Sequence, residues 1–576
     1  MEHARFLLSD EEDTERISYD DESSEDEYDI CETREEDTDT EQEEELDAKQ
    51  NKNASTSEQG ESTFYIGRDS KTRWNKFPIT QLRKKKRHNI AMHLPGPIGD
   101  ATKVTSIMDC WNLFIGKDIL EMLVKFTNEQ IKKIQPNYGR ERDANLTDLI
   151  EIKALIGILY VAGCKKLNRC NPDELWTADG TGLEIARTIM SDKRFKFLLH
   201  SLRFDDKNSR KERIKTDKLA AVRDMVDIFV NSCQQNYSMS EYCTIDEKLE
   251  GFRGRCGFRQ HMPKKPNRHG IKIYILVDAR MYYTYNLEIY CGKQPEGEYS
   301  VSNSPDQIVK RLVKPIAKSW RNLTVDNWFT SCSLVSDLLQ DRITMVGTIR
   351  KNKRELPLRF TDVRSRKVYS SLFGFSKDFT LVSYVPKKNK NVLLLSSFHR
   401  NDTIDDTTGS RKKPEILTFY NLTKGGVDIL DQLTSNYNVQ RNTKRWTMVI
   451  FYCLLNIAGV NAHIIHHSNK NTTNDISRKG FLKQLGLELM FEQIERRKHM
   501  CCLPKDIRES AKRICPSPSS PKTSVETENK RKRCADCGRA KNRYTKYKCK
   551  KCEKFLCLSH ITPMCKNCIE ENRISI

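Results

Sequence analysis

Between about residues 106 and 240, apolar residues recur at three- and four-residue spacing. This period is typical of amphipathic helices, and three segments show it most clearly. They are Ile119–Thr127, Leu149–Ala162 and Leu219–Phe229. Thr147 stands where an N-cap would precede the second of these segments. The pattern predicts a helical domain here, without obvious catalytic chemistry.

From about residue 242 the pattern changes to short apolar runs and alternation. Ile271–Val277 and Tyr282–Tyr290 flank a turn at 278–281 and predict neighbouring antiparallel strands. A helix over Asp306–Ser319, broken at Pro315, should lead to a strand at Leu323–Asp326. A further helix and a strand at Thr344–Ile349 follow. Strands first, and then strand–helix alternation, predict a mixed α/β sheet.

Two later segments complete the pattern. Residues 353–415 are polar, with short strands at Leu381–Tyr384 and Val392–Ser396, and should interrupt the catalytic sheet as an insertion. Thr447–Ile465 is long and apolar but contains Asn456 and Asn461. It therefore predicts a buried helix that crosses a domain, and not a membrane span.

Three aspartate-containing stretches lie far apart in the chain. They are Thr244-Ile245-Asp246-Glu247, Thr324-Val325-Asp326-Asn327-Trp328 and Gly425-Gly426-Val427-Asp428-Ile429-Leu430-Asp431. A carboxylate after apolar residues is costly to bury unless a cation compensates it, and Mg²⁺ prefers such oxygen ligands. Asp428 and Asp431, three residues apart, would share one helix face. Taken singly, each aspartate also fits a strand end or a helix cap. Together they predict a two-Mg²⁺ site for phosphodiester chemistry.

The charge distribution indicates the substrate. Residues 1–50 hold 23 acidic and 4 basic residues, so the rest of the chain, with 95 Lys+Arg and 56 Asp+Glu, carries +39. Such an excess favours a polyanionic partner, with double-stranded DNA as the first candidate. Acidic lipid is less favoured because the basic residues are dispersed. No small-molecule substrate is indicated.

A cysteine-rich C-terminal segment predicts two zinc ions. Its eight candidate ligands are Cys534, Cys537, Cys549, Cys552, Cys557, His560, Cys565 and Cys568. In a cross-brace, the pairs 534/537 and 557/560 hold one ion and the pairs 549/552 and 565/568 the other; sequential pairing is the alternative. Lysines between the ligands, Lys548 among them, favour DNA binding over a chromatin-reading or ubiquitin-ligase role.

Several further residues are candidates for nucleic-acid contact or targeting. Trp446 fits either stacking on an unpaired base or the core of the following helix. Arg441 and Lys444 are predicted phosphate contacts. Lys530-Arg531-Lys532-Arg533 resembles a nuclear-import signal, so we expect the protein in the nucleus.

The motifs around the aspartates resemble those of piggyBac-family transposases. The matching runs include Gly251-Phe252-Arg253-Gly254-Arg255-Cys256, Val325-Asp326-Asn327-Trp328-Phe329 and Lys424-Gly425-Gly426-Val427-Asp428. The resemblance implies a ribonuclease H-like core in which Asp246, Asp326 and Asp428 are catalytic and Asp431 is an additional required carboxylate. It also implies a homodimer on DNA that nicks transposon ends, forms and opens hairpins, and joins 3′ ends to TTAA targets. For Trp446 it favours the contact with DNA over the core. A domesticated DNA- or chromatin-binding descendant without activity, or a nuclease without strand joining, are the alternatives.

The expected organisation has eight parts. They are a disordered acidic then basic region (1–95), a helical dimerisation and DNA-binding domain in two parts (96–241 and 438–515), the core (242–352 and 416–437), the insertion (353–415), a linker with the import signal (516–533) and a cross-brace zinc finger (534–576).

Overall fold

The computed structural model describes residues 63–79, 94–263, 265–469, 476–515, 532–537, 541, 543–549 and 553–561. The chain divides into two compact units, residues 1–515 and 516–576. The predictions for the acidic tail (1–50) and for Cys552, Cys565 and Cys568 lie outside the described residues.

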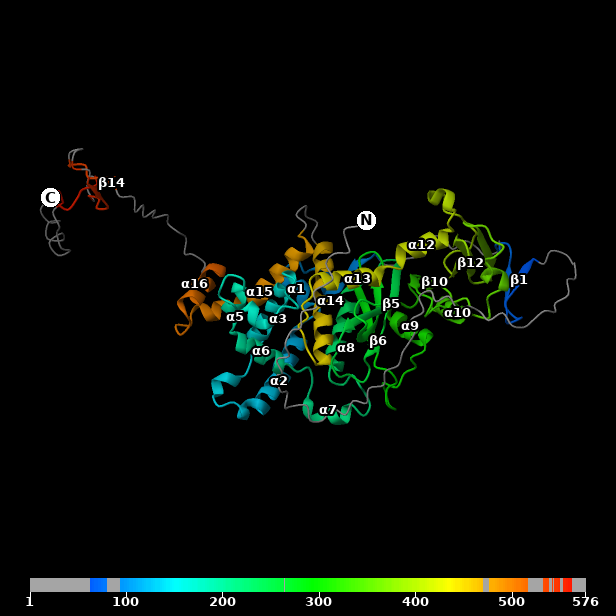
Figure 1. Ribbon diagram of the computed structural model, residues 1–576, viewed down its shortest axis with the longest axis horizontal. Coiled ribbons are helices and arrows are strands. Elements are labelled where there is room, and N and C mark those ends of the chain that lie inside the picture. Colours follow the sequence, from blue (N-terminus) through cyan, green and yellow to red (C-terminus); the bar gives the residue numbers. More distant parts are fainter. Residues whose placement is uncertain are drawn as a thin grey trace. The chain divides into compact units, whose positions relative to one another are not determined.

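The first unit is organised by a mixed sheet (Figure 1). Its centre comprises β5 (Tyr242–Gly251), β7 (His269–Asp278), β8 (Thr284–Ile289), β9 (Asn322–Val325) and β10 (Thr344–Thr348). In space their order is β8-β7-β5-β9-β10, with β8, β7 and β5 antiparallel and β5, β9 and β10 parallel. This is the ribonuclease H-like core that the resemblance implies.

The local predictions in this core are largely confirmed. β7 and β9 are almost entirely buried, which explains their continuous apolar runs. The predicted helix at 306–319 is α9 (Pro305–Val313), and a 3-10 turn, Lys314–Ile316, follows it at Pro315. Proline lacks the N–H that a continuing helix needs. Between β9 and β10 lies α10 (Cys332–Gln340).

The insertion departs from the prediction, because its strands extend the sheet. β11 (Ser371–Phe375), β12 (Thr380–Lys387) and β13 (Lys390–Ser396) form an antiparallel set, and β13 pairs with β10. The insertion interrupts the core in sequence only. At the edge of the core sheet, β10 would leave backbone N–H and C=O groups unpaired. Pairing with β13 satisfies them.

The prediction that residues 1–95 lack structure is wrong for 63–79. β1 (Phe64–Ile66) and β2 (Arg73–Asn75) form a hairpin, and β2 pairs with β11 at Asn75 and Phe375. Trp74 is fully buried. The composition of this segment is polar. It is nevertheless ordered, because Trp74 is buried and β2 pairs with the distant strand β11.

The remaining elements are mostly helices. They are α1 (Ile107–Asn112), α2 (Lys117–Ile134), α3 (Leu149–Cys164), α4 (Pro172–Leu175), α5 (Glu184–Ile189), α6 (Asp192–Ser201), α7 (Lys207–Arg213), α8 (Arg223–Gln235), α11 (Leu358–Thr361), α12 (Glu415–Thr423), α13 (Gly426–Asn436), α14 (Trp446–Asn469), α15 (Arg478–Lys498) and α16 (Lys505–Ile514), with a small strand pair, β3 (Gly96–Pro97) and β4 (Tyr237–Ser238). The predicted N-cap is corrected from Thr147 to Asp148, whose side chain accepts from Glu151 N. The predicted helix at 219–229 begins only at Arg223, because residues 217–222 form turns that precede it.

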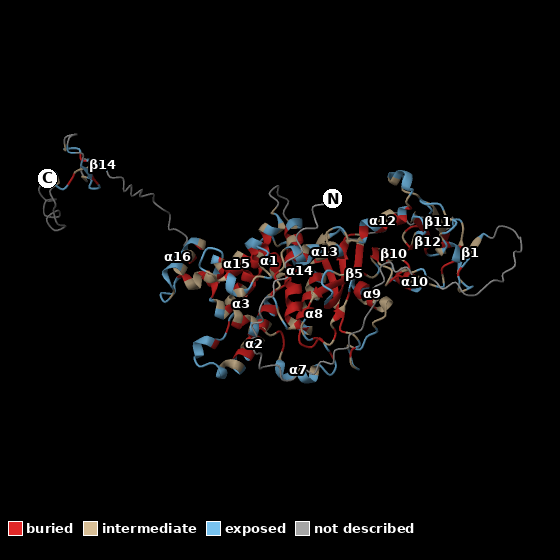
Figure 2. Cartoon of the chain, in the orientation of Figure 1, coloured by how far each residue is buried: buried red, intermediate tan, exposed pale blue. Residues whose placement is uncertain are grey.

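Helices from both sides of the core in sequence pack together. α3 approaches α15 so closely that a Cβ on Gly157 would lie 2.7 Å from the carbonyl oxygen of Gly486. The Tyr160 hydroxyl donates to Leu455 O at 2.6 Å and accepts from Trp111 Nε1 at 2.9 Å. α14 is long and apolar enough to cross a membrane, yet 94% of its most apolar window is buried. It is the buried helix that the sequence predicted (Figure 2).

The second unit contains a strand pair, β14 (Lys532–Arg533) and β15 (Tyr544–Thr545). Two residues of the predicted import signal, Lys532 and Arg533, are therefore the exposed first strand of this unit. Lys530 and Arg531 lie outside the described residues.

Candidate active site

Two of the three aspartates follow a shared Thr-x-Asp pattern. Because side chains alternate along a strand, Thr244 and Asp246 share one face of the sheet. β5 and β9 are parallel neighbours with Thr244 opposite Thr324. Asp326 follows the last residue of β9, so the register sets it beside Asp246 at the same height. Neighbouring strands lie about 4.8 Å apart, which makes the two backbones close neighbours.

The two threonines also position the helix that carries the third aspartate. Thr244 Oγ1 donates to the carbonyl oxygen of Thr423 at 2.6 Å, and Thr324 Oγ1 lies 2.7 Å from Thr423 Oγ1. Thr423 ends α12, and α13 begins three residues later. Gly426 permits the approach, since a Cβ there would lie 3.0 Å from Thr244 Oγ1. Asp428, in the first turn of α13, is thereby brought to the face that holds Asp246.

The charges of the three carboxylates act on a common neighbour, Tyr420. Burial raises the pKa of Tyr420 to about 12, and the charges of Asp326, Asp246 and Asp428 all contribute to this shift. Burial also raises the pKa of Asp246 well above its usual range, with further contributions from Glu247 and Asp326. Burial, followed by the charge of Glu247, raises the pKa of Asp326 to about 6.

Buried carboxylates with raised pKa values fit the binding of a divalent cation. Asp246 and Asp326 each keep an oxygen occupied by the backbone, accepting from Glu247 N at 2.7 Å and Trp328 N at 2.9 Å. These backbone hydrogen bonds orient the carboxylates and lower their pKa values, but the raising effect of burial is larger. Hard oxygen donors of like charge on one face are the donor set that Mg²⁺ prefers.

Asp431 has a different environment from the other three. Its Oδ1 accepts from Lys248 Nζ at 2.7 Å, and the same nitrogen donates to Thr434 Oγ1 at 2.9 Å and pairs with Glu250 at 3.2 Å. The Lys248 side chain is only 5% exposed. Lys248 lies two residues after Asp246 on the same face of β5, so this buried ion pair fastens α13 to the strand. Sequence analysis did not identify Lys248, although its position in the alternation of β5 was the available signal.

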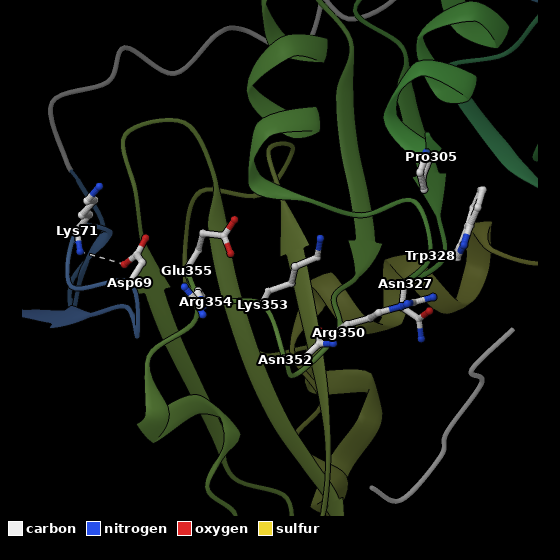
Figure 3. A pocket seen from close by; sticks show the side chains of 10 residues that line it. All are labelled: Asp69, Lys71, Pro305, Asn327, Trp328, Arg350, Asn352, Lys353, Arg354 and Glu355. Atoms are coloured by element: carbon white, nitrogen blue, oxygen red, sulfur yellow. Dashed lines mark hydrogen bonds between the residues drawn. The ribbon is translucent and has the colours of Figure 1, made fainter. Parts of the chain in front are cut away.

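A basic cavity is lined by Asn327 and Trp328, which directly follow Asp326 in sequence (Figure 3). Its volume is about 720 Å³, and it lies between Asn327 and Trp328 on one side and the loop after β10 on the other. The lining residues are Asp69, Lys71, Pro305, Asn327, Trp328, Arg350, Asn352, Lys353, Arg354 and Glu355. The charge of Arg350 lowers the pKa of Asp326, against the larger raising effect of burial. The cations of this loop were not predicted as site residues from the sequence.

In the second unit, four predicted ligands come together. The ligand atoms of Cys534, Cys537, Cys557 and His560 all lie within 4.8 Å of one another. Individual separations are 3.4 Å from Cys534 Sγ to His560 Nδ1 and 3.6 Å from Cys537 Sγ to Cys557 Sγ. Such spacings suit four ligands around one zinc ion, and Cys557 N also donates to Cys534 Sγ at 3.2 Å. This set is one half of the predicted cross-brace; Cys549 is described, but its partners are not.

The predicted DNA contacts fare differently. Arg441 is corrected: it is buried, and its guanidinium donates to the carbonyl oxygens of Leu167 and Cys170. Trp446 is 9% exposed and meets Phe258 edge-on at 5.1 Å, which favours the core alternative. Lys444 and Lys548 are exposed, and Lys548 pairs with Glu553 at 2.9 Å.

Comparison with known proteins agrees with this geometry. Residues 106–463 match the family model described as Transposase IS4. A solved structure, described as a cryo-EM structure of piggyBac transposase synaptic complex with hairpin DNA, is similar with a TM-score of 0.70 and 36% identity, over 82% of this chain and 100% of that one. The chain belongs to the piggyBac-type transposase family.

Human relatives of this piggyBac-type chain are more distant. PiggyBac transposable element-derived protein 3 is 21% identical over 77% of this chain and 73% of its own length. PiggyBac transposable element-derived protein 2 is 23% identical over 62% of this chain and 60% of its own length.

Proposed function

We propose that this protein is a cut-and-paste DNA transposase. The observation that carries the proposal is the register of β5 and β9, which sets two half-buried carboxylates side by side under the helix that bears a third. A scaffold that buries such carboxylates, at the cost that the raised pKa values of Asp246 and Asp326 indicate, would use them to hold a cation. In a chain of this family, that use is phosphodiester chemistry.

Asp246, Asp326 and Asp428 would hold two Mg²⁺ ions. When bound, these ions would supply Lewis-acid stabilisation of the phosphoryl transition state and an activated water. The Thr244 and Thr324 hydroxyls hold the three carboxylates on one face, and Lys248 fixes α13 through Asp431.

The proposed reaction has three stages. Hydrolysis nicks each transposon end and leaves a 3′-hydroxyl. That hydroxyl attacks the opposite strand, exchanging one phosphodiester bond for another and closing a hairpin. After the hairpin is opened, the 3′-hydroxyls join both ends to a TTAA target. The zinc-binding unit, with Lys548 exposed on it, would bind the terminal repeats, and a homodimer would hold the two ends.

The proposal has a direct test. The full chain is incubated with Mg²⁺ and a duplex that carries the terminal repeats flanking its own gene, and nicking and binding are measured side by side. Asp246→Asn, Asp326→Asn and Asp428→Asn should each slow nicking on the order of 10³-fold, since Lewis-acid stabilisation is worth several kcal/mol. Binding should change little.

Asp341→Asn is the matched control. Asp341 is exposed and lies just before β10, at the opposite end of the parallel strands from Asp326. It should nick at the wild-type rate. A site variant that nicks as fast as this control is not a metal ligand.

A second candidate is a transposase-derived DNA- or chromatin-binding protein without activity. The curated relatives are named as derived from a transposable element, which favours it. The retained set of four carboxylates argues against it. Binding of the terminal repeats with no nicking by the wild-type chain would support this second candidate. If active, the protein would work in the nucleus, which the basic run Lys530–Arg533 would serve.

A further inference from the structure

The N-terminal hairpin lies against the loop that follows β10, more than 280 residues away in sequence. The hairpin comprises β1, β2 and the turn between them, residues 64–75. Its anchor is Trp74, which is fully buried and packs edge-on against Phe379 at 5.6 Å. Tyr65 meets Phe360 edge-on at 5.3 Å. These contacts fasten the hairpin beside the loop 350–356.

From that position the hairpin bonds the loop's backbone. Asp69 N donates to Arg354 O at 2.9 Å and Trp74 Nε1 to Glu355 O at 2.8 Å. Arg68 N donates to Leu356 O at 3.3 Å, and its guanidinium donates to Lys353 O at 2.7 Å and to Lys351 O. Five carbonyl groups of the loop thus bind the hairpin. They are those of Lys351, Lys353, Arg354, Glu355 and Leu356.

The loop that is held this way carries the cations of the cavity beside Asp326. Arg350, Lys353 and Arg354 repel one another, so a free loop would spread them apart. The hairpin fixes their backbone and adds Lys71 and Asp69 to the cavity wall (Figure 3). Arg68 itself is occupied by carbonyl oxygens and is a link to the loop, not a lining residue.

We propose that the hairpin is a positioning element for the loop's cations, and that the cavity they line holds a phosphodiester backbone next to the carboxylates. This inference rests on the proposed function, because it takes DNA as the ligand. Fixing the cations before DNA arrives removes the entropy of ordering them from the binding step. The N-terminal segment therefore belongs to the active-site machinery, although it precedes the helical domain.

The test compares Arg68→Ala with Arg73→Ala. Both remove one positive charge from the same hairpin, but Arg73 is exposed and its guanidinium lies over Phe64 at 5.1 Å. The first measurement needs no DNA. Trypsin cleaves after Arg350, Lys351, Lys353 and Arg354 only when the loop opens. Arg68→Ala should increase cleavage there at least about tenfold, and Arg73→Ala should match wild type.

The second measurement is the salt dependence of duplex binding. Each phosphate contact contributes about −0.9 to the slope of log K against log salt. Arg73→Ala can change the slope by one contact at most. Arg68→Ala should change it by more than one contact, because it releases several loop cations at once. Equal melting temperatures of the two variants would exclude a general loss of stability.

Two results would overturn the inference. One is a loop in Arg68→Ala that resists trypsin as wild type does. The other is an opened loop with a salt slope equal to that of Arg73→Ala. Failure of the wild-type chain to nick DNA would instead count against the proposed function, and both measurements on the hairpin would still be read from proteolysis and binding.

Discussion

The two candidate metal centres differ in what holds their ligands together. Asp246 stands on β5, Asp326 directly follows β9 and Asp428 is on α13. The Thr244 and Thr324 hydroxyls and the Lys248 ion pair hold these elements together. In the described part of the second unit, the buried residues are Cys534, Thr545 and Cys557, and two of these three are ligands themselves. In the first centre the folded scaffold itself positions and buries the carboxylates. In the second the ligands are most of the core, so the ion must supply the folding free energy.

The largest effect expected from this difference is unfolding of one unit alone. Zinc removal by a chelator, or Cys537→Ser, should unfold the described part of residues 532–561, since structural zinc contributes on the order of 10 kcal/mol. The first unit should keep its melting temperature, because its core contains no zinc ligand among the described residues. Amide spectra of the full chain would show loss of the zinc-unit signals alone.

Cys502→Ser serves as the control for that change. Cys502 is an exposed thiol in the first unit, outside the cluster. Zinc-unit signals that survive chelation would show that residues 532–561 fold without the ion, and the contrast between the centres would be lost.

A second prediction tests whether Asp431 is a metal ligand or a residue that anchors α13 to β5. If Asp431 acts through Lys248, then Lys248→Met and Asp431→Asn should each slow nicking about 10- to 100-fold by letting α13 shift, and the double variant should be no slower than either. Lys248→Met also leaves two acids without their cation, which costs about 3–5 kcal/mol in such buried pairs. Stability must therefore be measured beside the rate.

Lys498→Met provides the stability control for Lys248→Met. Lys498 is also a buried lysine, paired with Glu495 at 2.8 Å, but at the end of α15. It should lose stability and keep its nicking rate. If Asp431→Asn is as slow as Asp246→Asn whether or not Lys248 is present, Asp431 is a metal ligand.

The centres also differ in how far the sequence predicted them. Cys534-x2-Cys537 and Cys557-x2-His560 are local spacings that identify two ligand pairs, and the cluster is the one that the cross-brace pairing predicts. Asp246 and Asp326 required a sheet register, which the matched Thr-x-Asp patterns encode on two strands. α13 was predictable because Gly425-Gly426 precedes an amphipathic run.

What sequence analysis missed depends on contacts between distant residues. Trp74 gives no sign in its own neighbourhood that its partner is the backbone of Glu355. Arg441 lies in a basic stretch whose composition is typical of an exposed segment. Its side chain is buried because its guanidinium donates to the carbonyl oxygens of Leu167 and Cys170. Two of the three insertion strands, β12 and β13, were predicted, but the pairing of β13 with β10 was not, since alternation shows that a strand exists and not which neighbour it takes.

The smallest expected effect tests whether the fold of the first centre buries Asp326 at a cost in stability. The pKa of Asp326 is raised from its usual value near 3.8 to about 6. A carboxyl whose pKa is raised on folding favours the folded state while it is protonated, and that stability is lost as pH rises from about 4 through about 6. Without divalent cations, Asp326→Asn should therefore melt higher than wild type at pH 7.5. The partly exposed side chain limits the gain to about 1–2 kcal/mol, or a few °C. At pH 4 the two proteins should melt together, as Asp341→Asn and wild type should at both pH values. Identical melting of Asp326→Asn and wild type at pH 7.5 would mean that burying the charged Asp326 carboxylate without metal has no cost in stability. The two centres would then differ only in their ligands, and not in whether the fold or the ion offsets the cost of bringing the ligands together.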